Sequence, residues 1–310
     1  MTRLAVIAGS AGSRLARAIA SLAGIDPTGT SIEVFPDGEL GVEVGAVRGA
    51  DVYVVQPTAP PVHERLVELL LLIDAARRSG AARLTAVIPY LGYSRQDRRA
   101  SEGGAIGGRV MADAIGAAVD RVVVIDLHAP PTEAFFATPV EHLDAVPIMV
   151  ERVRPLVREH VVVAPDLGAL KRAERFAAAL GLTVACVRKR RLSGREVEAR
   201  GVEGDVRGRP ALIVDDMIST GATVAAAAAA IRAAGASPDL VVAATHGIFA
   251  PPAVEAIRSA APRALLVTDT VPAAEASGLS TEVVSIAGLL ADAIGRMHRE
   301  EPLGGLVRHG

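Results

Sequence analysis

The chain has 310 residues, and its 50% hydrophobic content is enough for two cores, which must be aliphatic because only 3% of residues are aromatic. Its formal net charge of -2 predicts no general attraction to nucleic acid or to anionic membranes. The single cysteine, Cys186, excludes an intrachain disulfide and any multi-cysteine metal site, which is consistent with a reducing compartment.

Short runs rich in valine and isoleucine alternate along the chain with segments rich in alanine, leucine and arginine. The first pattern predicts buried strands at 4–8, 52–56, 84–88, 122–126, 161–164, 184–188, 211–214, 240–245 and 264–268. The second pattern predicts helices at 14–22, 62–79, 107–117, 169–180, 224–234 and 285–299. Such alternation is typical of α/β proteins, in which helices cover both faces of mainly parallel sheets.

A proline-containing segment at 139–147 interrupts the alternation, and we place a domain boundary there, between 1–142 and 143–310. Each half has a polar site at the end of a predicted strand, with Asp126 and His128 in the first and Asp215 and Asp216 in the second. This arrangement suggests a duplicated fold, although the self-similarity is too weak to establish a sequence repeat.

The apolar segments are too short for export or membrane insertion. The amino-terminal run stops at Gly9, and the most apolar segment, 66–73, is interrupted by Glu68. Both fall far short of the roughly 20 residues that a membrane-spanning helix needs. We therefore expect a cytoplasmic protein with no membrane contact.

The segment 212–223 contains the pattern that most directly indicates function. An apolar strand ends in Asp215 and Asp216, and a small, hydroxyl-rich turn then opens into an alanine-rich helix. Backbone amides, hydroxyls and the helix dipole favour a phosphate at such a turn, which is formed by Ser219, Thr220, Gly221, Ala222 and Thr223. The two carboxylates would repel that phosphate, so we expect them to face sugar hydroxyls, with or without a divalent cation.

The alternative for this segment is purely structural, because acids often end strands and hydroxyl residues often cap helices. Two adjacent acids at the end of an apolar strand are, however, costly to desolvate and contribute little to capping. The acid pair followed by the hydroxyl-rich turn therefore favours a ribose-phosphate site. This segment resembles the phosphoribosyl-diphosphate loop of the type I phosphoribosyltransferases and of ribose-phosphate diphosphokinase.

Further motifs occur in the order and approximate spacing of the ribose-phosphate diphosphokinase family, and the resemblance runs nearly from end to end. They are Phe35-Pro36-Asp37-Gly38-Glu39, Arg95-Gln96-Asp97-Arg98, Asp126-Leu127-His128-Ala129, Pro165-Asp166, Lys189-Arg190-Arg191 and Gly204-Asp205-Val206. An ordered set of this kind is far more specific than one match. The resemblance implies two phosphoribosyltransferase-like domains, an ATP-side domain followed by one with the ribose 5-phosphate loop and a catalytic flap. It also suggests that the last helix packs back on the first domain.

The resemblance implies a magnesium-dependent reaction in which the diphosphoryl group of ATP moves to the 1-hydroxyl of ribose 5-phosphate, giving 5-phosphoribosyl 1-diphosphate and AMP. Lys189 and Arg191 would then lie on a mobile flap that closes over the triphosphate, with Arg190 facing solvent. From the residues alone, a solvated cationic loop is the simpler interpretation.

The metal and the nucleotide are also assigned by resemblance. His128 and Asp166 belong to the Mg²⁺ and phosphate neighbourhood, and His128 would bind ATP phosphate or a metal-bound water at least as often as the ion itself. For ATP, the resemblance implies Asp37, Gly38 and Glu39 from one subunit and Arg95 and Gln96 from its neighbour, hence self-association, with Phe35 near the adenine. Without the family, Asp37-Gly38 is an ordinary tight turn.

Two alternatives stay open at this stage. A non-catalytic regulatory homologue is supported by the segment 100–109, which is glycine-rich and carries an acid where the bacterial pattern continues with basic residues. A phosphoribosyltransferase would share the loop at 215–223 but would need neither Arg95-Gln96 nor Lys189.

Overall fold

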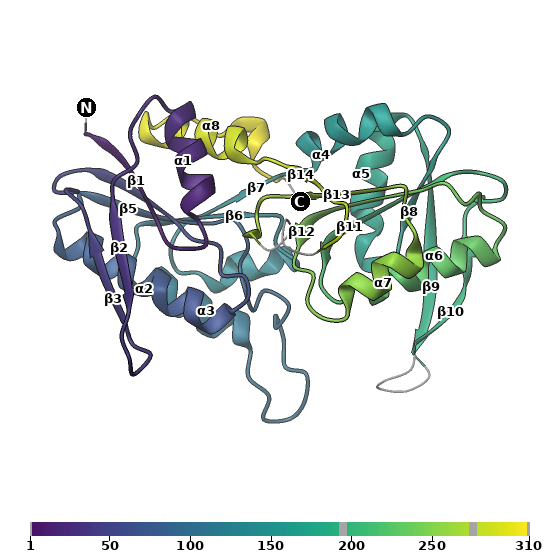
Figure 1. Ribbon diagram of the computed structural model, residues 1–310, viewed down its shortest axis with the longest axis horizontal. Coiled ribbons are helices and arrows are strands. Elements are labelled where there is room, and N and C mark those ends of the chain that lie inside the picture. The colour runs from purple at the N-terminus through teal and green to yellow at the C-terminus, as the bar shows by residue number, and fades with distance from the viewer. Residues whose placement is uncertain (1, 192–196, 273–277, 309–310) are drawn as a thin grey trace. The chain divides into compact units, whose positions relative to one another are not determined.

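The computed structural model describes residues 2–191, 197–272 and 278–308, with side chains except at 189–200. The chain divides into two compact units (Figure 1). Unit 1 comprises Met1–Asp144, Thr270–Pro272 and Ile286–Gly310, and unit 2 comprises Ala145–Asp269 and Ala273–Ser285. The contacts therefore divide close to the boundary expected after residue 142, and the residues from Ile286 onward belong to unit 1.

Unit 1 is built on a parallel sheet in the order β1-β4-β5-β6-β7. These strands span Leu4–Ala8, Asp51–Val55, Arg83–Ile88, Arg121–Ile125 and Val140–Leu143. An antiparallel pair, β2 (Thr30–Val34) and β3 (Leu40–Val44), forms a separate sheet. The helices are α1 (Ser13–Leu22), α2 (Val62–Arg78), α3 (Gly107–Gly116) and α8 (Ala287–His298), with 3-10 turns η1 (Pro130–Phe135) and η5 (Gly304–Leu306).

The helices of unit 1 cover both faces of its sheet, because strand residues alternate between the faces and almost all are apolar. On one face, Leu69, Leu72 and Ile73 of α2 and Ile115 of α3 pack in a core with valines of β4 and β6. On the other face, α1 packs against α8 (Figure 1).

Unit 2 has a sheet in the order β10-β9-β8-β11-β12-β13-β14, parallel except for β10. In chain order from β8, its strands span Val161–Ala164, Thr183–Arg191, Val197–Glu203, Ala211–Ile218, Leu240–Gly247, Ala264–Thr268 and Glu282–Val284. One face packs against α4 (Val146–Val153) and α5 (Leu170–Leu180), and the other against α6 (Ala222–Ala233) and α7 (Ala253–Ala260). Two 3-10 turns, η2 (Arg154–Leu156) and η3 (Leu167–Ala169), complete it.

The two units repeat the same order of elements: strand, helix, hairpin, then strands separated by helices and a final pair of strands. The helix that follows each final pair is exchanged. After β7 of unit 1 the chain forms α4, which belongs to unit 2, and after β14 of unit 2 it forms α8, which belongs to unit 1.

The α/β class with helices on both faces of mainly parallel sheets is confirmed, and each predicted strand and helix corresponds to an element. Two local predictions were wrong: the alternation of strands and helices is not interrupted at 139–147, which contains β7 and the start of α4, and the strand expected to end at Val214 continues to Ile218. The sequence pattern did not indicate β2, β3, β10, β14 or α7, because none of these elements has a long continuous apolar run. Within the described ranges, no helix is long and apolar enough to cross a membrane.

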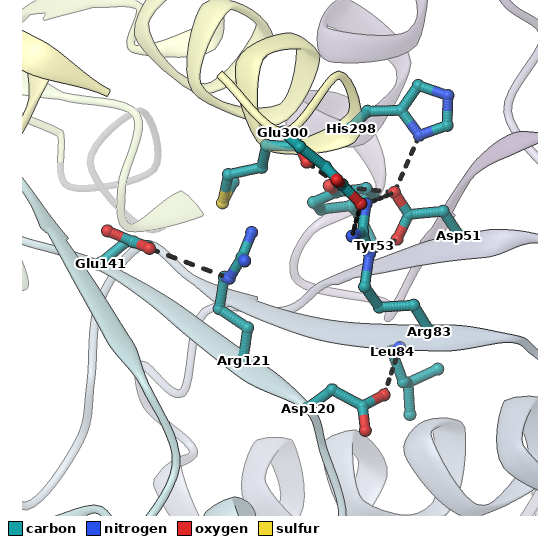
Figure 2. Close-up of polar contacts among 10 residues, drawn as sticks. Asp51, Tyr53, Arg83, Leu84, Asp120, Arg121, Glu141, His298 and Glu300 are labelled. Atoms are coloured by element: carbon teal, nitrogen blue, oxygen red, sulfur yellow. Dashed lines mark hydrogen bonds and ion pairs between the residues drawn. The ribbon is translucent and has the colours of Figure 1, made fainter. Parts of the chain in front are cut away.

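A buried polar cluster anchors the exchanged helix α8 in unit 1 (Figure 2). Asp51, 1% exposed, accepts hydrogen bonds from Arg83 at 2.8 and 2.6 Å and from Tyr53 at 3.3 Å, and its Oδ2 lies 2.8 Å from Nδ1 of His298. Arg83 also donates to the carbonyl of Met297 in α8 at 3.2 Å. Burial acts to raise the pKa of Asp51, but the hydrogen bonds from Arg83 and His298 outweigh it, so the pKa lies below its usual value.

Replacing Asp51 by Asn should destabilise unit 1 strongly, because it leaves Arg83 partly buried without a counter-charge. Breaking such a pair costs about 3–5 kcal/mol, measurable as a loss of unfolding free energy in urea. A lowered folded-state pKa means that the contribution of Asp51 is complete above the unfolded pKa of about 3.9 and is lost as pH falls through the folded value. The difference between wild type and variant should therefore shrink only in acid.

The matched control is Asp74→Asn, which removes a carboxylate from an exposed pair with Arg78 on α2. Exposed pairs contribute about 0–1 kcal/mol, so this variant should unfold close to wild type. Equal losses in the two variants would contradict the anchoring role of Asp51.

Candidate functional site

The loop after β11 in unit 2 has the backbone of an anion site. Gly221 is the N-cap of α6 with φ of 74°, and a Cβ there would stand 3.0 Å from Cβ of Ala256 and 3.2 Å from the carbonyl oxygen of Ala253. Only glycine fits this left-handed, crowded position. In the described structure, the backbone N–H groups of Thr220, Gly221, Ala222 and Thr223 have no hydrogen-bond acceptor within the chain. These amides and the positive end of the α6 dipole can therefore bind a phosphate.

Asp215 and Asp216 lie within β11 rather than after it, as a consequence of the longer strand. Both are half-buried, and the backbone N–H of Asp216 donates to Oδ1 of Asp215 at 2.9 Å. Burial raises the pKa of Asp215 well above its usual value, and repulsion from Asp216 and then Asp166 raises it further. The acid pair is therefore under electrostatic strain that hydroxyl donors or a cation would relieve.

Asp166 follows β8, the strand beside β11, and its carboxylate is fixed by its own turn. Oδ1 of Asp166 accepts from the backbone N–H groups of Gly168 and Ala169 at 3.0 and 3.3 Å. The negative charge of Asp166 raises the pKa of Asp215, which indicates that the carboxylates of Asp166, Asp215 and Asp216 lie near one another at one edge of the unit 2 sheet.

This donor set fits Mg²⁺, which prefers hard oxygen ligands. Among the described residues, no three His, Cys, Asp or Glu side chains form a complete metal cluster. That also agrees with Mg²⁺, which commonly takes one or two carboxylates and completes its shell with water and substrate phosphates.

Lys189 and Arg191 lie in β9 by their backbone, opposite Ala199 and Val197 of β10. The sequence predicts a strand that ends at Arg188, and the family resemblance implies a flap that contains Lys189 and Arg191, whereas β9 continues to Arg191. Their side chains lie outside the described part of the structure, so the proposed contact with the triphosphate stays a prediction.

Phe35, Asp37, Gly38 and Glu39 form the tight turn between β2 and β3 in unit 1. The N–H of Phe35 donates to the carbonyl of Glu39 at 2.8 Å, and Gly38 has φ of 91°. The backbone N–H of Glu39 donates to Oδ1 of Asp37 at 3.1 Å. Phe35 is 41% exposed and lies over Gly41, where a Cβ would meet its ring at 2.8 Å. The turn thus presents an aromatic ring and two carboxylates.

Arg95 and Gln96 lie in the loop after β5, and both side chains are exposed. The backbone of Gln96 is held by Tyr93, to whose carbonyl its N–H donates at 2.8 Å, and by Gly108, whose N–H donates to its carbonyl at 3.0 Å. No hydrogen bond joins this loop to the 35–39 turn within the residues that the structure describes.

His128 is exposed two residues after Asp126, at the carboxyl end of β6. Asp126 is fully buried and adopts φ of 41°, a left-handed conformation that is costly for a residue other than glycine. The following residue, Leu127, donates its N–H to Nε2 of His142 at 2.9 Å, and Nδ1 of His142 contacts Glu133. Burial lowers the pKa of His142, although Glu133 opposes the effect. No pattern in the sequence indicated that His142 supports the strand end next to His128.

The chain matches two protein-family models. Residues 4–118 match the model described as the N-terminal domain of ribose phosphate pyrophosphokinase, and residues 195–308 match the phosphoribosyl synthetase-associated domain. The chain is 40% identical over 301 residues to the ribose-phosphate pyrophosphokinase of Aquifex aeolicus, covering 96% of each chain. It is 39% identical over 310 residues to that of Clostridium perfringens, covering 98% of this chain and 97% of the relative.

A solved structure agrees with the sequence comparisons. The phosphoribosylpyrophosphate synthetase from Mycobacterium smegmatis superposes with a TM-score of 0.89 at 34% identity, covering 96% of this chain and 100% of that one.

Replacing Asp215 by Asn should stabilise the protein at neutral pH. Because the folded-state pKa of Asp215 is raised, the folded state binds the proton more tightly than the unfolded chain, and stability falls as pH rises from the unfolded value of about 3.9 through the folded value. Asn removes this penalty and still accepts from the N–H of Asp216. The melting temperature at pH 7 should rise by a few degrees. A lower melting temperature would show that ionised Asp215 is compensated in the folded chain.

Proposed function

The chain belongs to the ribose-phosphate pyrophosphokinase family and is an enzyme of phosphoribosyl diphosphate synthesis, and from that premise we propose how its residues carry out the reaction. The substrates are ATP and ribose 5-phosphate, the diphosphoryl group of ATP is transferred to O1 of the sugar, and AMP leaves. The observation that carries the proposal is the unit 2 edge, where unpaired amides at 220–223 adjoin Asp215, Asp216 and Asp166.

Ribose 5-phosphate binds at this edge through two kinds of contact, one to its phosphate and one to its hydroxyls. Its phosphate binds the loop of Ser219, Thr220, Gly221, Ala222 and Thr223, where the α6 dipole favours negative charge. Asp215 and Asp216 accept hydrogen bonds from the ribose hydroxyls. The separation of amides from carboxylates sets the direction of the sugar and leaves O1 to attack.

ATP binds through residues of unit 1 in this proposal. Phe35 borders the adenine, the turn residues Asp37, Gly38 and Glu39 contact the nucleoside, and Arg95, Gln96 and His128 contact the remainder of the nucleotide. The exposure of the Phe35 ring, Arg95, Gln96 and His128 supports this assignment. Arg95 can bind phosphate oxygens through a planar fork of donors.

Transfer proceeds by in-line attack of O1 on the β-phosphorus, with departure of the AMP oxygen. The negative charge that builds on the phosphoryl oxygens is met by Lys189 and Arg191, one a compact charge and the other a fork of donors. Asp166 in unit 2 and His128 in unit 1 are each proposed for the Mg²⁺ and phosphate neighbourhood, and the ion would neutralise charge on the triphosphate when bound. The cytoplasmic location stays a prediction.

Replacing Lys189 by Ala should reduce the rate of AMP formation by about 10²–10³-fold, because a cation that stabilises the transition state is lost. The assay supplies ATP, Mg²⁺ and ribose 5-phosphate and separates AMP from ADP. Arg190→Ala is the matched control: it removes the neighbouring cation, and its rate should stay near wild type. ADP as the product, or no AMP from folded wild type, would contradict the proposed reaction.

We also propose that the protein self-associates, with ATP bound between Arg95 and Gln96 of one subunit and the 35–39 turn of another. Mixed oligomers of Arg95→Ala and Glu39→Ala chains should then recover part of the activity that each variant lacks, since some sites would contain neither substitution. The chains are unfolded together, refolded and assayed for AMP. Activity no higher than that of the two separate variants would show that ATP is not shared in this way.

A further inference from the structure

Arg172 is a buried cation in unit 2 that the proposed mechanism does not use. It lies in the first turns of α5 and is 6% exposed, although its neighbour Lys171 is exposed. Its Nη1 donates to Oγ1 of Thr245 in β12 at 3.2 Å. A buried guanidinium is costly unless its charge is paired, so its position in the fold is informative.

The hydrogen bond to Thr245 places Arg172 at the level of the acid pair. In the sheet order, β11 lies between β8 and β12, and α5 packs against β8 and β11. Arg172 therefore reaches over β11 to contact β12. The register pairs Asp215 with Ala244 and Met217 with His246, so position 216 lies opposite Thr245.

The face of the sheet agrees with this placement. Val214 and Ala243, two residues before Asp216 and Thr245, lie together in the core that includes α5. Side chains alternate along a strand, so Thr245 lies on the α5 face, as its hydrogen bond with Arg172 shows. The same alternation, counted from Val214, directs Asp216 to this face, and it is broken before Ile218, which packs in the core on the α6 face.

Thr245 is itself held in place, which makes it a firm support for Arg172. Thr245 and Thr268 are 1% and 0% exposed, and the hydroxyl of Thr268 donates to the carbonyl of Thr245 at 2.6 Å. The pairing of β12 with β13 shifts register between Ala243 and His246, a local irregularity of the kind that redirects side chains beside functional sites.

We propose that Arg172 is a positioning residue of the ribose 5-phosphate site, which holds Asp216 as an oriented carboxylate facing the sugar hydroxyls. Its charge offsets the repulsion that Asp215 and Asp166 exert on this edge, and it does so from below the strand, without touching the substrate. The inference rests on the proposed function, because it assumes that Asp216 accepts from the sugar.

The test compares Arg172→Met, Arg172→Lys and the control Lys171→Met in the full chain. KM for ribose 5-phosphate, KM for ATP and kcat are measured, together with ribose 5-phosphate binding by calorimetry. Arg172→Met should raise KM and Kd for ribose 5-phosphate by about tenfold, equivalent to about 1.4 kcal/mol, with KM for ATP unchanged. Arg172→Lys should recover part of the loss, and Lys171→Met should match wild type.

A merely structural Arg172 would give a different pattern: a lower melting temperature in Arg172→Met, with no selective change in ribose 5-phosphate affinity. That result would overturn the proposal. If Arg172→Met does not fold, Thr245→Val removes only the acceptor and should still weaken ribose 5-phosphate selectively, and unchanged affinity there would also overturn it. Wild type that binds ribose 5-phosphate but forms no AMP would refute the proposed reaction while the Arg172 prediction is still decided by calorimetry.

Discussion

Asp215 and Asp216 are consecutive, half-buried residues of the otherwise buried strand β11, and their carboxylates repel each other; Asp166, which follows the neighbouring strand β8, adds to the repulsion. This repulsion contributes nothing to the stability of the fold, because apolar residues at the same positions would pack without it. The same edge also presents a loop whose amides lack acceptors in the described chain. A sugar phosphate has hydroxyls and a phosphate group with the complementary properties, so the ligand proposed for this edge would relieve the repulsion and bind the amides at once. Binding of that ligand would explain why unit 2 tolerates the arrangement.

The two units share one topology but use the corresponding edges differently. In unit 1 the loop after β1 already binds an anion of the chain itself: Ser10 donates through both its N–H and its hydroxyl to Glu68, a buried residue of α2 that also pairs with Arg65. In unit 2 the loop after β8 contributes a carboxylate, Asp166, instead. Both loops thus bind a carboxylate of the chain: in unit 1 it comes from the neighbouring helix α2, and in unit 2 it comes from the turn itself, where Asp166 accepts from the N–H groups of Gly168 and Ala169.

The exchanged helices tie the amino-terminal and carboxyl-terminal halves of the sequence into both units. Helix α8 reaches unit 1 at the end of the chain, and Asp51 joins it there to strands formed about 250 residues earlier, through Arg83 and His298. The free-energy cost of burying the charge of Asp51 is offset because its carboxylate accepts hydrogen bonds from several donors, which is the condition under which a buried charge is stable. The same condition would be met in unit 2 by the proposed pairing of Arg172, which is buried, with Asp216.

The sequence by itself determined the α/β class, the strands and helices with continuous apolar runs, and the loop around Gly221, because these depend on neighbours in the chain. It also identified the family, through motifs whose order is specific, whereas the residues that the resemblance assigns to ATP, such as Arg95, stay a prediction. It did not determine where β11 ends, since Asp215 and Asp216 are polar and are held in the strand only by pairing with β12. Nor did it reveal the exchange of α4 and α8, the anchoring of His298 or the position of Arg172. These features were decided by tertiary structure, because each depends on contacts between residues far apart in the chain, which local pattern does not encode.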